Sequence, residues 1–206
     1  MTEHLMTPLC DLAVKHGTDK GGWHTKAGET CHVYTPAYHL LLAPYREQIK
    51  SVLEIGVNYG PSLRMWSDYF PNARIIGLDS NADCLFTDGR IECFAADQNN
   101  AESLEGALTL AGIPKYDLIV DDGSHEEAHQ VFSANVLSSR LAPNGIYVIE
   151  DITWDCKPWH YLSQIHGYEA YAAFNTGVGI GKAHCACCNE GERLLVLAHN
   201  PDRLFK

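Results

Sequence analysis

Short apolar runs and longer amphipathic segments alternate along this chain from residue 51 onward. The apolar runs are rich in β-branched residues and end in Gly or Asp, which predicts strands at Ser51–Val57, Arg74–Asp79, Ile91–Ala96, Tyr116–Asp121, Gly145–Glu150 and Arg193–Ala198. Segments between them repeat their apolar residues with a period of about 3.6, which predicts helices such as Ala101–Ala111 and Glu126–Leu141. Strands that alternate with helices are typical of a parallel sheet with helices on its faces. We therefore expect an α/β fold with a Rossmann-like, doubly wound sheet.

The first 50 residues follow a different pattern. Helix-like segments at Glu3–His16 and Tyr38–Ile49 enclose the glycine-rich stretch GTDKGGWHTKAGETCHVYTP. Loops of about 20 residues are uncommon in compact domains and are usually functional or disordered. This one is rich in polar and aromatic side chains, so we expect a lid over a binding site, with a plain surface loop as the alternative. Residues 1–50 are thus interpreted as N-terminal helices and a lid loop, and residues 51–206 as the ligand-binding part of the same domain.

Composition narrows the classes of function. Lys and Arg number 15 against 26 Asp and Glu, and the resulting net charge of −11 disfavours binding to a nucleic-acid backbone. No apolar run approaches the roughly 18 to 20 residues that span a bilayer, and the N-terminus has no secretory signal pattern. We expect a cytoplasmic protein that acts on a small molecule without nucleic acid or membrane, with a homo-oligomer as the default assembly.

A glycine-containing turn follows the first predicted strand, in the sequence EIGVNYG from Glu54 to Gly60. Gly56 and Gly60 tolerate positive φ and let a ligand approach the backbone closely. Asn58 stands where the dinucleotide fingerprint has its middle glycine, which weakens the case for a pyrophosphate. The acidic Glu54 instead suits a ligand that has an ammonium group. A tight turn without a ligand is the alternative interpretation.

Further polar side chains end the next strands of the predicted sheet. Asp79 is placed to accept hydrogen bonds from a ribose diol, and Asp97 and Gln98 are placed to meet an adenine amino group. Asp121, at the end of the fourth strand, completes the candidate cofactor residues. Together with the glycine turn, these groups match the methionine, ribose and adenine parts of S-adenosylmethionine. Each Asp would also serve as an ordinary helix N-cap.

A second group of acidic residues suggests a metal ion. Asp122 follows the fourth predicted strand, and Glu150 and Asp151 end the fifth, so their side chains are expected to converge. Ligands that are all oxygen suit Mg²⁺, which lowers the pKa of a bound hydroxyl. His125 lies three residues after Asp122, where it is placed to act as the general base. Helix capping and a surface turn are the alternative roles of these acids.

Several of these segments resemble one known family. The sequences HGTDKG, VLEIGVNYG, YFPNARIIGLD, VDDGSH and IED are similar to class I S-adenosylmethionine methyltransferases of the metal-dependent sugar O-methyltransferase group, within it the macrolide and rhamnosyl enzymes of the mycinamicin type. The resemblance covers roughly residues 15 to 152. It implies a seven-stranded sheet with an antiparallel last strand, and Mg²⁺-dependent methylation of a hydroxyl on a natural product or sugar. It also implies a site composed of Asp122, Glu150 and Asp151 for the metal, His125 for catalysis, and Gly56, Asp79, Asp97 and Gln98 for the cofactor.

Two other functions stay open. Cys185 and Cys188 have C-x-x-C spacing beside His184, which is half of a structural Zn²⁺ site and suggests a noncatalytic zinc-containing interaction module. Reduced thiols at a surface turn explain the same segment. The strand-end acids would also suit a metal-dependent hydroxylase or hydrolase, because a fold does not determine its chemistry.

Overall fold

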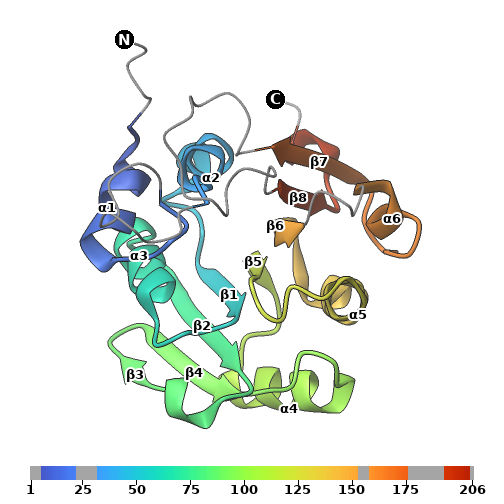
Figure 1. The fold of residues 1–206 in the computed structure, drawn as a ribbon, viewed down its shortest axis with the longest axis horizontal. Helices are drawn as coiled ribbons and strands as arrows, with labels where there is room; N and C mark the ends of the chain where they lie inside the picture. The colour runs from blue at the N-terminus through green and yellow to red at the C-terminus, as the bar shows by residue number, and fades with distance from the viewer. Residues whose placement is uncertain (1–5, 22–31, 153–157, 176–192, 205–206) are drawn as a thin grey trace.

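The computed structural model describes residues 6–21, 32–152, 158–175 and 193–204, and these form a mixed sheet with helices on both faces (Figure 1). The sheet has eight strands in the order β3-β4-β2-β1-β5-β6-β8-β7. Their bounds are β1 Ser51–Ile55, β2 Arg74–Asp79, β3 Thr87–Asp88, β4 Ile91–Ala95, β5 Tyr116–Asp121, β6 Leu141–Ile152, β7 Ala170–Asn175 and β8 Arg193–Ala198.

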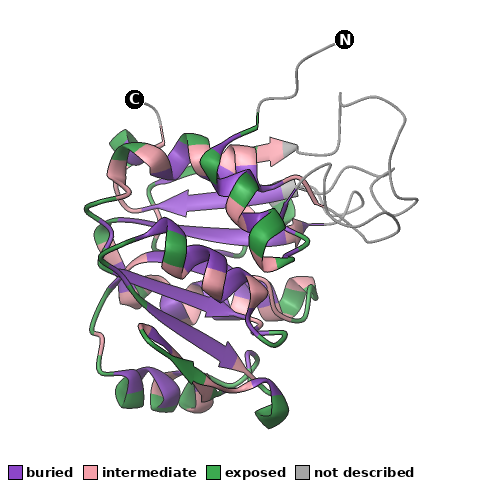
Figure 2. Ribbon diagram, turned by 90° about the vertical axis from the view of Figure 1, so that its left-hand side faces the viewer, coloured by how far each residue is buried: buried purple, intermediate pink, exposed green. Residues whose placement is uncertain are grey.

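Two helical layers cover the sheet. The helices are α1 Pro8–His16, α2 Thr35–Leu42, α3 Pro61–Tyr69, α4 Ala101–Ala111, α5 Glu127–Leu137 and α6 Pro158–Leu162, with short 3-10 turns at Ala43–Tyr45, Ala82–Cys84, Ser138–Arg140 and Pro201–Arg203. Val52 and Ile75 pack with α1, α2 and α3, whereas their neighbours Leu53 and Ile76 pack with α4 and α5. This alternation places two apolar cores on the two faces of the sheet, and Figure 2 shows the buried strands between the helices.

The strand directions agree with the expected fold, but the number of strands differs. Strands β4, β2, β1, β5 and β6 are parallel, and β8 is antiparallel to both β6 and β7, so the antiparallel last strand is confirmed. The expected count of seven strands is wrong. The two-residue strand β3 pairs antiparallel with β4 across a turn at Gly89, whose φ is 57°. Both residues of β3 are exposed, so they carry no hydrophobic pattern that would predict a strand.

The N-terminal helices belong to the same packing unit as the sheet. Helix α1 begins after Thr7, whose side chain caps it, and ends at Gly17 with φ 71°. Helix α2 begins at Thr35, before the expected Tyr38. Leu9 of α1 and residues of α2 share one apolar core with strand β1. None of the helices in the described ranges is long and apolar enough to cross a membrane.

Candidate active site

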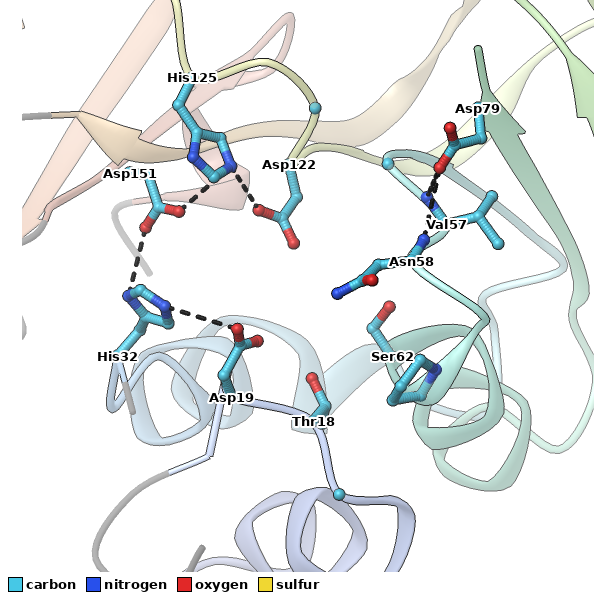
Figure 3. Close-up of a pocket in the computed structure, with 14 residues that line it drawn as sticks. Thr18, Asp19, His32, Val57, Asn58, Ser62, Asp79, Asp122, His125 and Asp151 are labelled. Carbon is cyan, nitrogen blue, oxygen red and sulfur yellow. Dashed lines mark hydrogen bonds and ion pairs between the residues drawn. The ribbon is translucent and has the colours of Figure 1, made fainter. Parts of the chain in front are cut away.

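The carboxyl ends of β1, β2, β5 and β6 open into a pocket of about 740 Å³ (Figure 3). Its lining residues are Gly17, Thr18, Asp19, His32, Gly56, Val57, Asn58, Pro61, Ser62, Asp79, Asp122, Gly123, His125 and Asp151. Figure 3 shows Asp79 with the glycine turn on one side of this pocket and His125 between Asp122 and Asp151 on the other. The set contains five of the residues expected from the sequence, namely Gly56, Asp79, Asp122, His125 and Asp151.

Asp122, His125 and Asp151 form a cluster of side chains that could act as metal ligands. His125 Nε2 lies 3.1 Å from Asp122 Oδ1 and 3.3 Å from Asp151 Oδ2. One potential ligand atom of each residue lies within 4.8 Å of the others. The hydrogen bond with Asp122 is the largest cause that raises the pKa of His125 above its ordinary value, and the charge of Asp151 adds to it. The imidazole is therefore held between two carboxylates that favour its protonated form.

The backbone at two of these residues is in an uncommon conformation. His125 has φ 59° and Asp151 has φ 55°, in the left-handed region that residues other than glycine rarely occupy. Asp151 also lies where the pairing of β6 with β8 shifts its register, between Ile149 and Ile152. Such conformations cost about 1 to 3 kcal/mol each and concentrate at functional sites. Two of the three converging side chains, those of His125 and Asp151, therefore extend from strained backbone.

Lys20 contacts this cluster through Asp122 and was not among the site residues predicted from the sequence. Its side chain is 1% exposed, and its Nζ donates hydrogen bonds to Asp122 Oδ2 and, at 2.9 Å, to Glu150 Oε2. Glu54 Oε1 lies 3.5 Å from the same nitrogen. The one signal in the sequence was its position in HGTDKG, next to residues that line the pocket.

Glu54 and Glu150 therefore direct their carboxylates toward Lys20, and neither lines the pocket. Glu54 also accepts hydrogen bonds from Ser62 Oγ at 2.6 Å and from Trp66 Nε1. Tyr38 donates its hydroxyl hydrogen to Glu150 Oε1. Burial raises the pKa of Glu150, and the Lys20 ammonium opposes that shift. The roles predicted for these two acids, in cofactor and metal binding, stay predictions.

Backbone hydrogen bonds connect the two described ends of the predicted lid loop. His32 N donates to Asp19 O at 2.9 Å, and Tyr34 N donates to Lys20 O at 2.9 Å. These two segments bring three side chains to the acids: Lys20, His32, whose Nδ1 is 3.4 Å from Asp151 Oδ1, and Tyr34, whose hydroxyl donates to the same oxygen. Residues 22–31, the middle of the expected lid, lie outside the described residues.

The glycine turn brings two strand ends into close contact. Gly56 has φ 94°, and a Cβ added to it would lie 2.0 Å from the carbonyl oxygen of Asp122. Asp79 Oδ2 accepts hydrogen bonds from the backbone N–H groups of Val57 and Asn58, at 2.8 and 3.4 Å. Gly60 has φ 84° and begins helix α3. The Asp79 carboxylate is thus fixed at the pocket wall, where it has further lone pairs for a ligand.

Gln98 and Asp121 are held by interior partners, and Asp97 lies in an exposed turn. Gln98 Nε2 donates to Asp121 Oδ1 at 2.7 Å, while its Oε1 accepts from the Ser124 N–H at 3.0 Å. Asp121 is fully buried and accepts a hydrogen bond from Tyr147 at 3.0 Å. Burial raises the pKa of Asp121 to about 6. None of the three lines the pocket, and their predicted cofactor contacts stay predictions.

Known proteins match the chain over most of its length. No protein-family model matches it. The 8-demethyl-8-alpha-L-rhamnosyl tetracenomycin-C 2'-O-methyltransferase of Streptomyces olivaceus is 38% identical over 151 residues, which are 70% of this chain and 37% of that protein. The mycinamicin VI 2''-O-methyltransferase of Micromonospora griseorubida is 37% identical over 70% of this chain and 36% of its own length. This chain is a homologue of sugar O-methyltransferases.

Solved structures agree with that relationship. The MycE methyltransferase of the mycinamycin biosynthetic pathway, in complex with Mg and SAH, has a TM-score of 0.61 and 37% identity, and the match covers 71% of this chain and 37% of MycE. Human methyltransferase-like protein 13, at 19% identity, shares the fold with a TM-score of 0.58 over 83% of this chain and 82% of its own. The homologue described here spans little more than a third of the length of its curated relatives.

These matches confirm the family resemblance inferred from the sequence motifs. They concern the sugar O-methyltransferase interpretation and give no support to the hydroxylase, hydrolase or zinc-module alternatives. The cysteine segment with His184, Cys185 and Cys188 lies outside the described residues, so the Zn²⁺ hypothesis stays a prediction.

Proposed function

We propose that this chain transfers the methyl group of S-adenosylmethionine to a hydroxyl group of a sugar or sugar-bearing natural product, with Mg²⁺ bound beside the acceptor. One observation carries the proposal. Asp122, His125 and Asp151 converge on the same pocket that the glycine turn and Asp79 enter from the other side (Figure 3). A donor site and a metal site then lie within one cavity, whose size is in the usual range for small-molecule sites.

The donor atoms of this group fit a hard divalent cation. Asp122 Oδ1 and Asp151 Oδ2 both face the position now spanned by His125 Nε2. Mg²⁺ is usually held by one or two carboxylates and keeps several exchangeable positions for water or substrate oxygens. When bound, it would lower the pKa of a coordinated acceptor hydroxyl. Asp122 and Asp151 are our proposed ligands, and Glu150 is the third ligand predicted from the sequence.

His125 is the proposed general base. The carboxylates on both sides of its imidazole raise its proton affinity, which suits a group that removes a proton near neutral pH. Asp122 also orients the ring, because its Oδ1 is the nearest partner of Nε2. The left-handed turn at His125 holds the imidazole at the pocket wall, so a hydroxyl bound by the neighbouring acids would lie within its reach.

The donor side of the pocket consists of backbone and one carboxylate. The absence of a Cβ at Gly56 leaves the turn open, and Asp79 is oriented by the N–H groups of Val57 and Asn58. We propose that Asp79 accepts hydrogen bonds from the ribose hydroxyls of S-adenosylmethionine. Holding donor and acceptor in one orientation accounts for several kcal/mol of a reaction barrier in such transfers, about 7 or more in favourable cases.

The acceptor class follows from the relatives and from the charge of the pocket. Relatives methylate rhamnosyl and mycinamicin hydroxyls, as their names state. In this chain, Thr18, Asp19 and His32 add polar groups to the lining, which suits an acceptor with several hydroxyls. The net charge of −11 opposes a nucleic-acid acceptor. A cytoplasmic location and a homo-oligomer remain predictions from the sequence.

Calorimetry and a methyl-transfer assay test the proposal. We expect S-adenosylmethionine to bind the purified chain, and labelled methyl to appear on a rhamnosyl or macrolide acceptor with formation of S-adenosylhomocysteine. EDTA and Asp151→Asn should abolish transfer, while the surface variant Asp83→Asn should retain it. No binding of S-adenosylmethionine with or without Mg²⁺ would refute the function. Turnover that withstands both EDTA and Asp151→Asn would refute the metal role alone.

A further inference from the structure

A fully buried ammonium group sits among carboxylates from three adjacent strands. Lys20 Nζ contacts Asp122 at the end of β5, Glu150 of β6 and Glu54 of β1. An ammonium has three hydrogens, and here three carboxylates surround it. Lysine is almost never fully buried unless it is paired, and the three carboxylates are the partners of Lys20.

Asp122 connects this ammonium to the proposed metal position. Its Oδ2 accepts a hydrogen bond from Lys20 Nζ. Its Oδ1 lies 3.1 Å from His125 Nε2, in the cluster with Asp151. The carboxylate therefore has one oxygen on each of two neighbouring positions that favour a cation. Two-metal enzymes place two divalent ions about 3.5 to 4 Å apart in sites of related design. In this chain the Lys20 ammonium, which is covalently attached, lies at the Oδ2 side of Asp122.

We propose that Lys20 is a positioning residue that takes the place of a second divalent ion, so that the site accepts one exchangeable metal. This inference rests on the proposed metal site at Asp122 and Asp151. Buried carboxylates without a counter-charge are costly, and the Lys20 ammonium is the counter-charge that contacts both Glu54 and Glu150. Because Lys20 cannot dissociate, it keeps Asp122 oriented toward the metal position before the metal arrives.

The backbone around Lys20 supports a fixed position for its side chain. Tyr34 N and Thr35 N both donate to Lys20 O, at 2.9 and 3.1 Å. The backbone of Lys20 is therefore tied to the start of helix α2. Tyr38 orients Glu150 from the opposite side through a hydrogen bond to Oε1. Both the ammonium and its acidic partners are thus held independently of any ligand.

Counting the Mn²⁺ ions bound by this chain distinguishes the proposed role of Lys20 from simple packing. The assay is a Mn²⁺ titration followed by electron paramagnetic resonance and calorimetry. We expect the wild-type chain and Lys20→Arg to bind one ion, and Lys20→Met to bind two ions with a spin-coupled signal. The control Lys15→Met removes an exposed lysine, paired with Asp68 on the surface, and should bind one. If folded Lys20→Met binds a single ion with unchanged affinity, the proposal is overturned.

A double variant locates the second ion. Glu54 contacts Lys20 but is not part of the cluster of Asp122, His125 and Asp151. The double variant Lys20→Met/Glu54→Gln should therefore lose the second ion and keep the first. Retention of two ions by the double variant would contradict the assignment. A packing role for Lys20 predicts no such dependence of metal count on Glu54.

The wild-type chain provides a test that does not depend on the folding of a variant. Saturation at one ion in millimolar Mn²⁺ supports the proposal, whereas two ions in the wild type refute it. The failures of the two proposals are also distinguishable. No bound ion in the wild type would remove the metal from the proposed function and this inference with it. One ion in both the wild type and folded Lys20→Met would remove this inference alone.

Discussion

Replacing Gly56 by alanine tests the close contact between the ends of β1 and β5. An alanine there has φ near 94°, which costs about 1 to 2 kcal/mol for a residue with a Cβ. Its Cβ would lie 2.0 Å from the Asp122 carbonyl oxygen and 2.8 Å from the carbonyl carbon. Both are backbone atoms, so the strand ends must move apart, and such overpacking costs about 1 to 3 kcal/mol. We expect the free energy of unfolding to fall by about 2 to 5 kcal/mol in total.

Two other glycines separate the contributions. Gly17 has φ 71° with no heavy atom within 4 Å of an added Cβ, so Gly17→Ala measures the conformational cost alone, about 1 to 2 kcal/mol. Gly106 lies exposed within helix α4 with similar free space, so Gly106→Ala should stabilise the protein by roughly 0.5 to 1 kcal/mol. Urea unfolding of all three variants measures the differences, provided that the m-value stays constant.

The outcome of this series is decisive for the strand-end geometry. The expected loss for Gly56→Ala corresponds to a fall in melting temperature of about 4 to 20 °C in a protein of this size. If Gly56→Ala destabilises the chain no more than Gly17→Ala, the contact between Gly56 and the Asp122 carbonyl is wrong. The placement of Asp122 beside the glycine turn would then fail with it.

Three further predictions concern His125 and Trp66. His125→Asn should lower kcat by about 10²- to 10⁴-fold, measured by labelled methyl transfer, and leave the Kd for S-adenosylmethionine unchanged, measured by calorimetry. An equal loss of kcat and of affinity for S-adenosylmethionine would contradict the role of general base. The raised pKa of His125 stabilises the metal-free folded chain fully below pH 6.5, and this stabilisation is lost as the pH rises through the folded pKa. Urea midpoints between pH 5 and 9 should therefore decline less steeply in His125→Asn, and identical slopes would count against the shift. Trp66→Phe removes a buried donor to Glu54 and should cost about 1 to 3 kcal/mol in urea unfolding, so a loss below that range would count against the hydrogen bond.

The central strands were predictable because they are buried on both faces. Arg74–Asp79, Tyr116–Asp121 and Arg193–Ala198 form strands with the bounds expected from their apolar runs. β7 was missed because its sequence AYAAFN has three alanines and no β-branched residue. β6 is longer than its apolar run because Leu141 already pairs with Tyr116 before the register shift. Buried apolar runs thus predict strands well. Strand residues that form by pairing at a sheet edge or beyond a bulge are not evident from the sequence.

The candidate site was predictable as far as sheet topology determines it. Parallel strands end at one edge, so the acid after β5 and the acids among the last residues of β6 were expected to approach one another. Side-chain directions were not predictable in this way. Lys20 is 102 residues from Asp122 and 130 from Glu150 along the chain, and no periodic pattern connects them. The direction of Glu54 and Glu150 toward that lysine became evident only in three dimensions.

The end of β6 shows why two adjacent acids do not have to serve one ligand. In a regular strand, successive side chains alternate between the two faces of the sheet, so Glu150 and Asp151 would point in opposite directions. The left-handed backbone at Asp151 and the register shift against β8 replace that alternation with a bulge. Glu150 then faces inward to Lys20 and Tyr38, whereas Asp151 faces the pocket and His125. The bulge thereby lets two adjacent acids both reach partners of Asp122, Glu150 through the Lys20 ammonium and Asp151 through His125, instead of lying on opposite faces of the sheet.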